Sequence, residues 1–186
     1  MKLGDGMLYF HKELKDKLKS DYQIKKAVMN KDYYKIETGL YSDVEFVNPL
    51  EIICKKYPNA IFTMNSAYYY YDLTDVIPDY FYLATKRSDS RINDINIKQL
   101  FIPNDLFDFG KTEIEIENIK INIYDEERML VELIRKRNIV PFDYYKEIIS
   151  NYRKKSDKLD IYKLQEYISY YKNELTLYDT LMREVF

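Results

Sequence analysis

The chain has 186 residues, 46% of them hydrophobic, and a formal net charge of −2. This composition argues against disorder, and the length suits one large domain or a small module joined to a medium one. A single cysteine, Cys54, excludes an internal disulfide, and we find neither a secretory signal nor an apolar run of about 18 residues. We therefore expect a cytoplasmic protein that does not enter a membrane.

Residues 8–19 and 20–30 predict two consecutive helices. In the first, apolar residues recur at every fourth position and so share one side of a helix. They are Phe10, Leu14 and Leu18. The second helix begins at Ser20, because its hydroxyl and the side chain of Gln23 can satisfy free amides of a first turn. Its inward face is expected to carry Ile24, Ala27 and Val28.

A short hairpin is expected after these helices. Residues 33–41 contain two strand-like pieces, separated by a turn at Gly39. Two helices and a hairpin in this order predict a small winged helix-turn-helix DNA-binding domain over residues 1–46. Residues 1–42 contain nine lysines and six acidic residues, an excess of positive charge that favours binding to phosphate groups. A lysine face that is merely solvated has the same composition.

The expected DNA-binding side chains lie on the second helix and on the hairpin. They are Gln23, Lys25, Lys26, Lys31 and Lys35. The hydroxyls of Tyr22 and Tyr34 can donate to phosphates, but we favour core or surface packing for both, since tyrosine is common throughout the chain. No arginine precedes Arg87, so the usual bidentate reader of guanine is absent. An operator rich in A·T pairs is therefore predicted, with Gln23 and Asn30 pairing with adenine.

A second domain is expected over residues 47–186. It opens with a helix at Asn48-Pro49, because Asn caps a helix and Pro tolerates its first position. Strands are predicted at residues 60–63, 80–85 and 97–102, with a helix at 66–72 and a hairpin at 113–124. Strands followed by a run of helices predict an α+β domain, in which the helices pack on one side or end of a mixed sheet.

The apolar period becomes helical from Asp125 onward and marks three buried helix faces. They consist of Met129, Leu130, Leu133 and Ile134; of Tyr144, Tyr145, Ile148, Ile149 and Tyr152; and of Ile161, Leu164, Ile168 and Tyr171. A short fourth helix is expected at 177–184.

We find no set of residues in this sequence that is typical of a catalytic site. His11 is the only histidine, which argues against His-rich metal sites and Ser-His-Asp triads. Cys54 lies on a predicted helix and is expected to pack rather than react. No glycine-rich phosphate loop occurs. We therefore predict no enzymatic activity, no cofactor and no metal.

Three further clusters have both a functional and a structural interpretation. Glutamates 113, 115 and 117 share one face of a hairpin, where carboxylates can hold a divalent metal or simply face water. Lys86, Arg87 and Arg91 lie on a polar loop, which can bind nucleic acid or an acidic partner, or be merely solvated. Residues 68–71 are four consecutive tyrosines, which can form a base-stacking platform or a partner surface. On a helix they point in all directions, some into the core and some half-exposed, so we favour packing.

An ordered set of short segments runs through most of the chain: Gly39-Leu40-Tyr41; Ile61-Phe62-Thr63 with Ser66-Ala67 and Asp72-Leu73-Thr74-Asp75 ahead of Pro78; Ile121 to Leu130; and Leu159 to Tyr167. This set resembles the AbiEi family of antitoxins. Their order and spacing agree over roughly residues 20–185. The resemblance implies an abortive-infection, type IV toxin-antitoxin system, in which the antitoxin counters a nucleotidyltransferase-like toxin without necessarily forming a stable complex. It also implies an amino-terminal winged helix that binds operator DNA and represses the antitoxin-toxin operon.

The sequence departs from the family at two points. The family's winged helix usually begins with an extra helix, whereas only residues 1–7 precede the first helical pattern here, so we expect a trimmed module. Glu126 stands where the family often has Pro, and a carboxylate also suits the first turn of a helix.

Two alternative functions stay open at this point. One is a stand-alone winged-helix transcriptional regulator whose second domain senses a ligand or dimerises. The other is a metal-dependent nuclease built around the hairpin of residues 113–124.

Overall fold

The computed structural model describes residues 6–186, and the chain divides after Pro58 into two compact units. We call residues 6–58 the amino-terminal unit and residues 59–186 the carboxy-terminal unit. We expected residues 1–7 to be too short for the extra helix that usually opens the family's winged helix. Residues 1–5 of this stretch lie outside the described residues. Within residues 6–186, none of the helices is long and apolar enough to cross a membrane.

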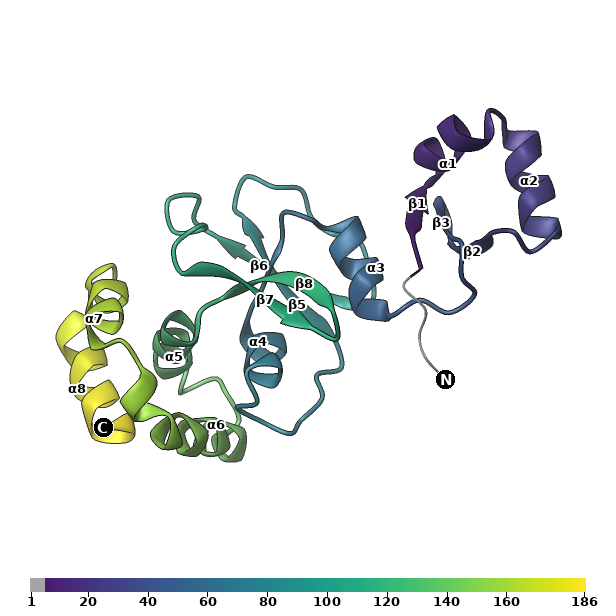
Figure 1. The fold of residues 1–186 in the computed structure, drawn as a ribbon. Helices are drawn as coiled ribbons and strands as arrows, with labels where there is room; N and C mark the ends of the chain where they lie inside the picture. The colour runs from purple at the N-terminus through teal and green to yellow at the C-terminus, as the bar shows by residue number, and fades with distance from the viewer. Residues whose placement is uncertain (1–5) are drawn as a thin grey trace. The chain divides into compact units, whose positions relative to one another are not determined.

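The amino-terminal unit combines a three-stranded antiparallel sheet with three helices (Figure 1). Its elements are β1 (Leu8–Phe10), α1 (His11–Leu18), α2 (Asp21–Met29), β2 (Tyr34–Glu37), β3 (Leu40–Ser42) and α3 (Pro49–Lys56). The strand order is β1-β3-β2, so the strand before α1 pairs with the second strand of the hairpin. Gly39 has a φ of 84° at the hairpin turn, a conformation that glycine adopts without steric cost. The predicted hairpin is therefore confirmed.

The prediction that the first helix begins at Leu8 is wrong, because the first three residues of that segment form β1. Leu8 lies opposite Ser42 and is buried, and Phe10 lies opposite Leu40. The helix begins only at His11, and Leu14 is the one fully buried residue of the predicted apolar side. Pairing with a strand 30 residues away overrides the local helical period, as tertiary contacts commonly do.

α2 begins where the sequence predicts it. The Ser20 hydroxyl accepts a hydrogen bond from the amide of Gln23 at 3.2 Å, and Ile24 and Ala27 are buried. The chain reverses between α1 and α2 at Lys19, whose φ of 73° lies in the left-handed region. Two helices joined by a short turn and followed by a hairpin form the frame of this unit.

α3 also begins at the predicted position, with the Asn48 side chain accepting a hydrogen bond from the amide of Leu50 at 2.9 Å. It groups with the amino-terminal unit, whereas we expected the boundary at 46/47. Two ion pairs join α3 to the rest of that unit: Lys55 to Glu13 at 2.8 Å, and Lys56 to Glu37 at 2.9 Å. A helix start in the sequence does not reveal which unit the helix packs against.

The carboxy-terminal unit is a mixed five-stranded sheet with five α-helices, which confirms the predicted α+β class. Its elements are β4 (Ile61–Phe62), α4 (Met64–Tyr70), β5 (Phe81–Lys86), β6 (Ile97–Ile102), β7 (Lys111–Ile116), β8 (Ile119–Tyr124), α5 (Glu126–Arg135), α6 (Phe142–Lys154), a 3₁₀ turn (Ser156–Lys158), α7 (Ile161–Ser169) and α8 (Glu174–Val185). The strand order is β6-β5-β4-β8-β7. Neighbours β5 and β6, and β4 and β8, run parallel, and the other pairs are antiparallel.

α5 is the central helix of this unit. Every residue from Arg128 to Ile134 is buried, because α5 packs against α4, α7 and α8, and the helices group beside the sheet (Figure 1). The predicted inward faces of α5 and α6 are confirmed, with Tyr144 only half-buried. On α7 Leu164 and Ile168 are buried, but Ile161 at the first turn is exposed.

The four consecutive tyrosines divide between core and surface, as predicted. Tyr68 is fully buried and donates a hydrogen bond to the carbonyl of Met129 at 3.2 Å. The other three are half-buried, and Tyr71 donates to the carbonyl of Tyr124 at 2.9 Å. These hydroxyls join α4 and the residue that follows it to α5 and to the end of β8.

Candidate nucleic-acid interface

All five side chains that we predicted to contact DNA are exposed. Gln23, Lys25 and Lys26 lie on α2, Lys31 lies in the turn after it, and Lys35 lies on β2. The fold therefore presents these polar side chains to solvent from one helix and the adjoining hairpin strand.

The lysines of the amino-terminal unit fall into two sets. One set is engaged by neighbouring side chains. Lys15 contacts Asp21 at 2.7 Å, Lys17 donates to the Tyr9 hydroxyl at 2.8 Å, and Lys55 and Lys56 form the ion pairs described above. The second set has no such partner within residues 6–186. It comprises Lys12, Lys19, Lys25, Lys26, Lys31 and Lys35.

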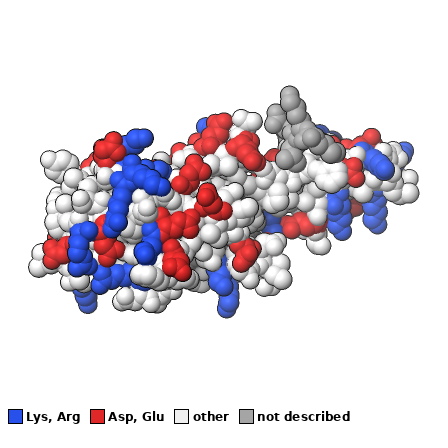
Figure 2. Space-filling view, turned by 90° about the horizontal axis from the view of Figure 1, so that it is seen from below, with Lys and Arg blue, Asp and Glu red and all other residues white. Residues whose placement is uncertain are grey.

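The pKa values of two acidic partners also distinguish the first set of lysines from the second. A hydrogen bond from Lys15, strengthened by the charges of Lys15 and His11, lowers the pKa of Asp21. Hydrogen bonds from Lys55 and from the Phe10 amide lower the pKa of Glu13. Asp21 and Glu13 are thus ionised near neutral pH and already paired with lysines of the first set. The lysines of the second set therefore remain available to an anionic partner. Figure 2 shows lysines projecting from this unit at the right, whereas basic and acidic side chains are interspersed over the other unit.

Lys31 occupies a special position where α2 ends. Its φ of 64° lies in the left-handed region, and its amide donates to the carbonyl of Val28 at 3.2 Å. The amide of Asp32 donates to the carbonyl of Ala27 at 2.9 Å. Such a left-handed residue closes a helix and redirects the chain, here from α2 into β2. Lys31 and Lys35 therefore follow α2 directly along the chain, on the turn and on the hairpin.

α2 also carries two exposed large side chains that the sequence analysis did not assign to an interface. Tyr22 is 72% exposed and Met29 is 83% exposed, so Tyr22 does not pack in the core. Both lie outside the buried stripe of Ile24 and Ala27, because a seven-residue separation brings them to the same outward face. The signal was present in the sequence: both residues fall out of phase with the apolar period of this helix.

The second predicted basic group lies on and after β5. The Lys86 ammonium is 5.4 Å from the ring centroid of Phe107 and 3.8 Å from the Asp108 carboxylate, so it faces its own unit. Arg87 and Arg91 are exposed and have no ion-pair partner among the described residues. Two of the three cations thus point to solvent from this loop.

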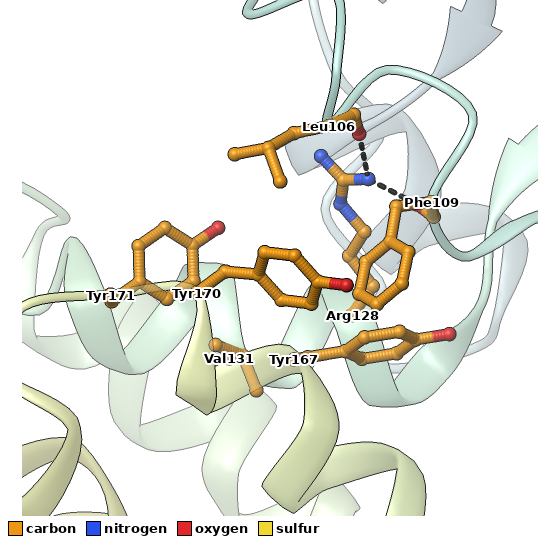
Figure 3. A pocket seen from close by; sticks show the side chains of 7 residues that line it. All are labelled: Leu106, Phe109, Arg128, Val131, Tyr167, Tyr170 and Tyr171. Carbon is orange, nitrogen blue, oxygen red and sulfur yellow. Dashed lines mark hydrogen bonds between the residues drawn. The ribbon is translucent and has the colours of Figure 1, made fainter.

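The buried side chain of Arg128 forms hydrogen bonds with the loop that precedes β7 (Figure 3). Arg128 is only 4% exposed, and its Nη1 donates to the carbonyl of Leu106 at 2.6 Å and to that of Phe109. Its guanidinium stacks on the Tyr124 ring, 3.9 Å from the centroid. The adjoining cavity has a volume of about 10 Å³, which is room for one water molecule. This cluster therefore holds the loop against α5 rather than enclosing a ligand.

A larger pocket of about 320 Å³ opens where α5 begins. Its lining consists of Tyr71, Asp125, Glu126, Glu127, Lys155, Lys158 and Leu159. Lys155 contacts the Glu126 carboxylate at 3.0 Å and the carbonyl of Tyr71 at 2.8 Å. The Tyr167 hydroxyl donates to Asp125 at 2.6 Å, and burial together with this bond raises the pKa of Tyr167. The charged groups of this pocket are thus largely paired with one another.

Cys54, His11 and Glu113, which we weighed for chemistry, are partly buried or paired with neighbouring side chains. Burial and the nearby Glu51 raise the pKa of Cys54 to about 11, which disfavours its reactive thiolate. His11 contacts Asp21 at 3.0 Å, and Glu113 contacts Lys120 across the hairpin at 3.1 Å. Among residues 6–186, no group of three or more His, Cys, Asp or Glu side chains is placed to hold a metal ion.

No protein-family model matches the chain, and a search of curated proteins finds no match. The case for an interface on α2 and β2 therefore rests on the geometry and charge of these elements.

Proposed function

We propose that the amino-terminal unit is a winged helix-turn-helix that binds duplex DNA, and that the protein is an antitoxin of the AbiEi type that represses its own operon. The observation that carries the DNA-binding proposal is the set of unpaired lysines on and after α2. Lys25, Lys26, Lys31 and Lys35 are exposed, while the other described lysines of this unit, apart from Lys12 and Lys19, are engaged by neighbouring side chains.

This arrangement suits the chemistry of DNA binding. A helix that enters the major groove needs long polar or cationic side chains on its outward face, and phosphates are held by cations beside the groove. α2 supplies Gln23 for the first role, and Lys25 and Lys26 of α2, together with Lys35 of the hairpin strand, supply cations for the second. The absence of arginine from this unit favours an operator rich in A·T pairs over one that is read at guanine.

Salt-dependent binding tests the DNA-binding proposal. Replacing Lys25 and Lys26 by Ala is expected to weaken binding to every duplex, because phosphate contacts do not depend on base sequence. The salt slope of log K should flatten by about 0.9 for each lost contact. The measurement is fluorescence anisotropy at several salt concentrations, with a labelled duplex taken from the DNA that precedes this protein's own coding sequence.

The matched control is Lys55→Ala, which removes a lysine that is already paired with Glu13. It should leave both affinity and salt slope unchanged. Identical titrations for the wild type and the Lys25/Lys26 double variant would refute the assignment.

The antitoxin role is supported by the ordered resemblance over roughly residues 20–185. It assigns the neutralising role to the carboxy-terminal unit and repression to the amino-terminal one. Its test is the protection of cells against the nucleotidyltransferase-like toxin that is expected to be encoded beside this protein.

One observation favours a second candidate function, a stand-alone regulator whose second unit senses a ligand. The pocket of about 320 Å³ in the carboxy-terminal unit is large enough for a small polar molecule. A genomic neighbourhood without any toxin gene would favour this function over the antitoxin.

A further inference from the structure

The outward face of α2 carries an apolar side chain at each end and two cations between them. Tyr22, Lys25, Lys26 and Met29 are spaced by three, one and three residues, which places all four on one side of the helix. All four are exposed, and within residues 6–186 none has a hydrogen bond, an ion pair or a ring contact from its side chain.

Tyr22 and Met29 contribute nothing visible to the packing of their own unit. The packing of α2 uses the opposite side of the helix, where Ile24 and Ala27 are buried. When a partner covers a large exposed apolar side chain, apolar surface leaves water and the complex is stabilised. The two side chains therefore mark a contact surface, and the charges between them indicate its partner.

Those charges favour a polyanion over a second copy of this chain. The only acidic residue of α2, Asp21, is already engaged by Lys15 and His11 at 2.7 and 3.0 Å. If two copies met through this face, Lys25 and Lys26 of each copy would lie opposite like charges, which opposes association. Duplex DNA offers both complementary phosphates and, on the base edges, apolar groups for the two ends of the stripe.

We infer that α2 reads thymine-rich duplex DNA by contacting thymine C5-methyl groups with Tyr22 and Met29. This inference rests on the proposed DNA binding and names the bases that the helix recognises. The C5-methyl is the apolar group that the major groove displays. Seven residues of helix rise about 10 Å, comparable with the major-groove width of about 12 Å, so both side chains can reach base edges in one groove.

Replacing thymine by deoxyuridine tests the inference, because it removes the methyl group and leaves base pairing unchanged. The probe is the duplex from the DNA that precedes the coding sequence, prepared with thymine and with deoxyuridine. The wild-type chain should bind the deoxyuridine duplex about fourfold more weakly for each methyl group contacted, from the transfer free energy of one methyl-sized group. Met29→Ala and Tyr22→Ala should each reduce this thymine-to-uracil ratio towards one.

Two controls keep the test specific. Ile95→Ala removes an exposed apolar side chain of the other unit and should preserve the wild-type ratio. Unchanged thermal unfolding of Met29→Ala and Tyr22→Ala should show that both variants fold normally, as expected for residues outside the buried side of α2.

The outcomes separate the inference from the function on which it rests. Equal affinity of the wild type for both duplexes, with the lysine variant still weakened, overturns the thymine inference and leaves DNA binding standing. No binding to either duplex overturns both. If Met29→Ala instead converts a dimer into a monomer in sedimentation velocity, the stripe is a self-association surface and the inference is wrong.

Discussion

Gly110 and Gly39 both have a positive φ, but only one of them is crowded. A Cβ atom at Gly110, where φ is 70°, would lie 3.0 Å from Cδ of Arg128 and 3.1 Å from the Tyr167 hydroxyl. At Gly39, where φ is 84°, a Cβ atom would meet nothing within 4 Å. Gly110 thus lets the loop before β7 approach Arg128, whereas Gly39 serves only the hairpin turn.

This difference predicts unequal effects of alanine at the two positions. Gly39→Ala should lower the free energy of unfolding by about 1–2 kcal/mol, the cost of a left-handed residue that carries a Cβ. Gly110→Ala should cost about 1–3 kcal/mol more, because the added Cβ overpacks the Arg128 cluster. Urea denaturation of both variants measures this difference, and equal costs would indicate that the loop moves away from Arg128 without penalty.

Single residues also show where local sequence is a poor guide to exposure. Core or surface packing was favoured for Tyr22 because the chain is rich in tyrosine, yet it is 72% exposed. Ile161 was assigned to a buried face, but it lies at the first turn of α7 and is exposed. Residue type favoured packing for Tyr22 and the apolar period favoured burial for Ile161, but neither side chain is buried among the described residues.

At the scale of elements, α1 and α3 are joined by a carboxylate whose charge matters for stability. Glu13 on α1 accepts from the Phe10 amide at 2.7 Å and pairs with Lys55 on α3 at 2.8 Å. Both contacts favour the ionised carboxylate and so lower its pKa in the folded state. The stabilisation is therefore present above the ordinary value of 4.5 and is lost as the pH falls below it.

Glu13→Gln should reveal this dependence on pH. At pH about 7 the variant should be less stable than the wild type by well under about 1 kcal/mol, since exposed ion pairs contribute little. At pH about 3 the two proteins should unfold at nearly the same temperature, because the wild-type carboxyl is then becoming protonated. Thermal unfolding followed by circular dichroism measures both conditions.

Asp16→Asn is the control for that experiment, because Asp16 is an exposed acid on the same helix without a described partner. It should show no such loss at either pH. A deficit for Glu13→Gln that persists unchanged in acid would contradict the role of the ion pair.

At the scale of the whole molecule, the proposal assigns repression and protection to different units. The 186-residue chain with Lys25 and Lys26 replaced by Ala should lose repression of a reporter placed behind its own promoter. The same variant should still protect growth when the neighbouring toxin is expressed, because the carboxy-terminal unit is unchanged. Reporter output and growth, measured in the same strain, test both expectations.

Lys55→Ala is again the matched control, and it should retain repression and protection. Simultaneous loss of both activities in the lysine variant, at an unchanged protein level, would show that the two roles are not divided between the units.

Much of the architecture follows from the sequence alone. Caps at Ser20 and Asn48 mark helix starts, because a side-chain oxygen next to free amides is a local interaction. The hairpin at residues 113–124 and the buried face of α5 follow from apolar periods of two and of 3.6 residues. The α+β class and the exposure of Lys25 and Lys26 could be predicted in the same way.

Tertiary structure alone decided the remaining features, because they depend on contacts between distant residues. The pairing of Leu8 with Ser42 turned a predicted helical segment into β1, and α3, which forms ion pairs with Glu13 and Glu37, groups with the amino-terminal unit. The separation of paired from unpaired lysines, on which the candidate interface depends, is also a product of the fold. A sequence gives the number of charges, but only packing determines which of them already have a partner.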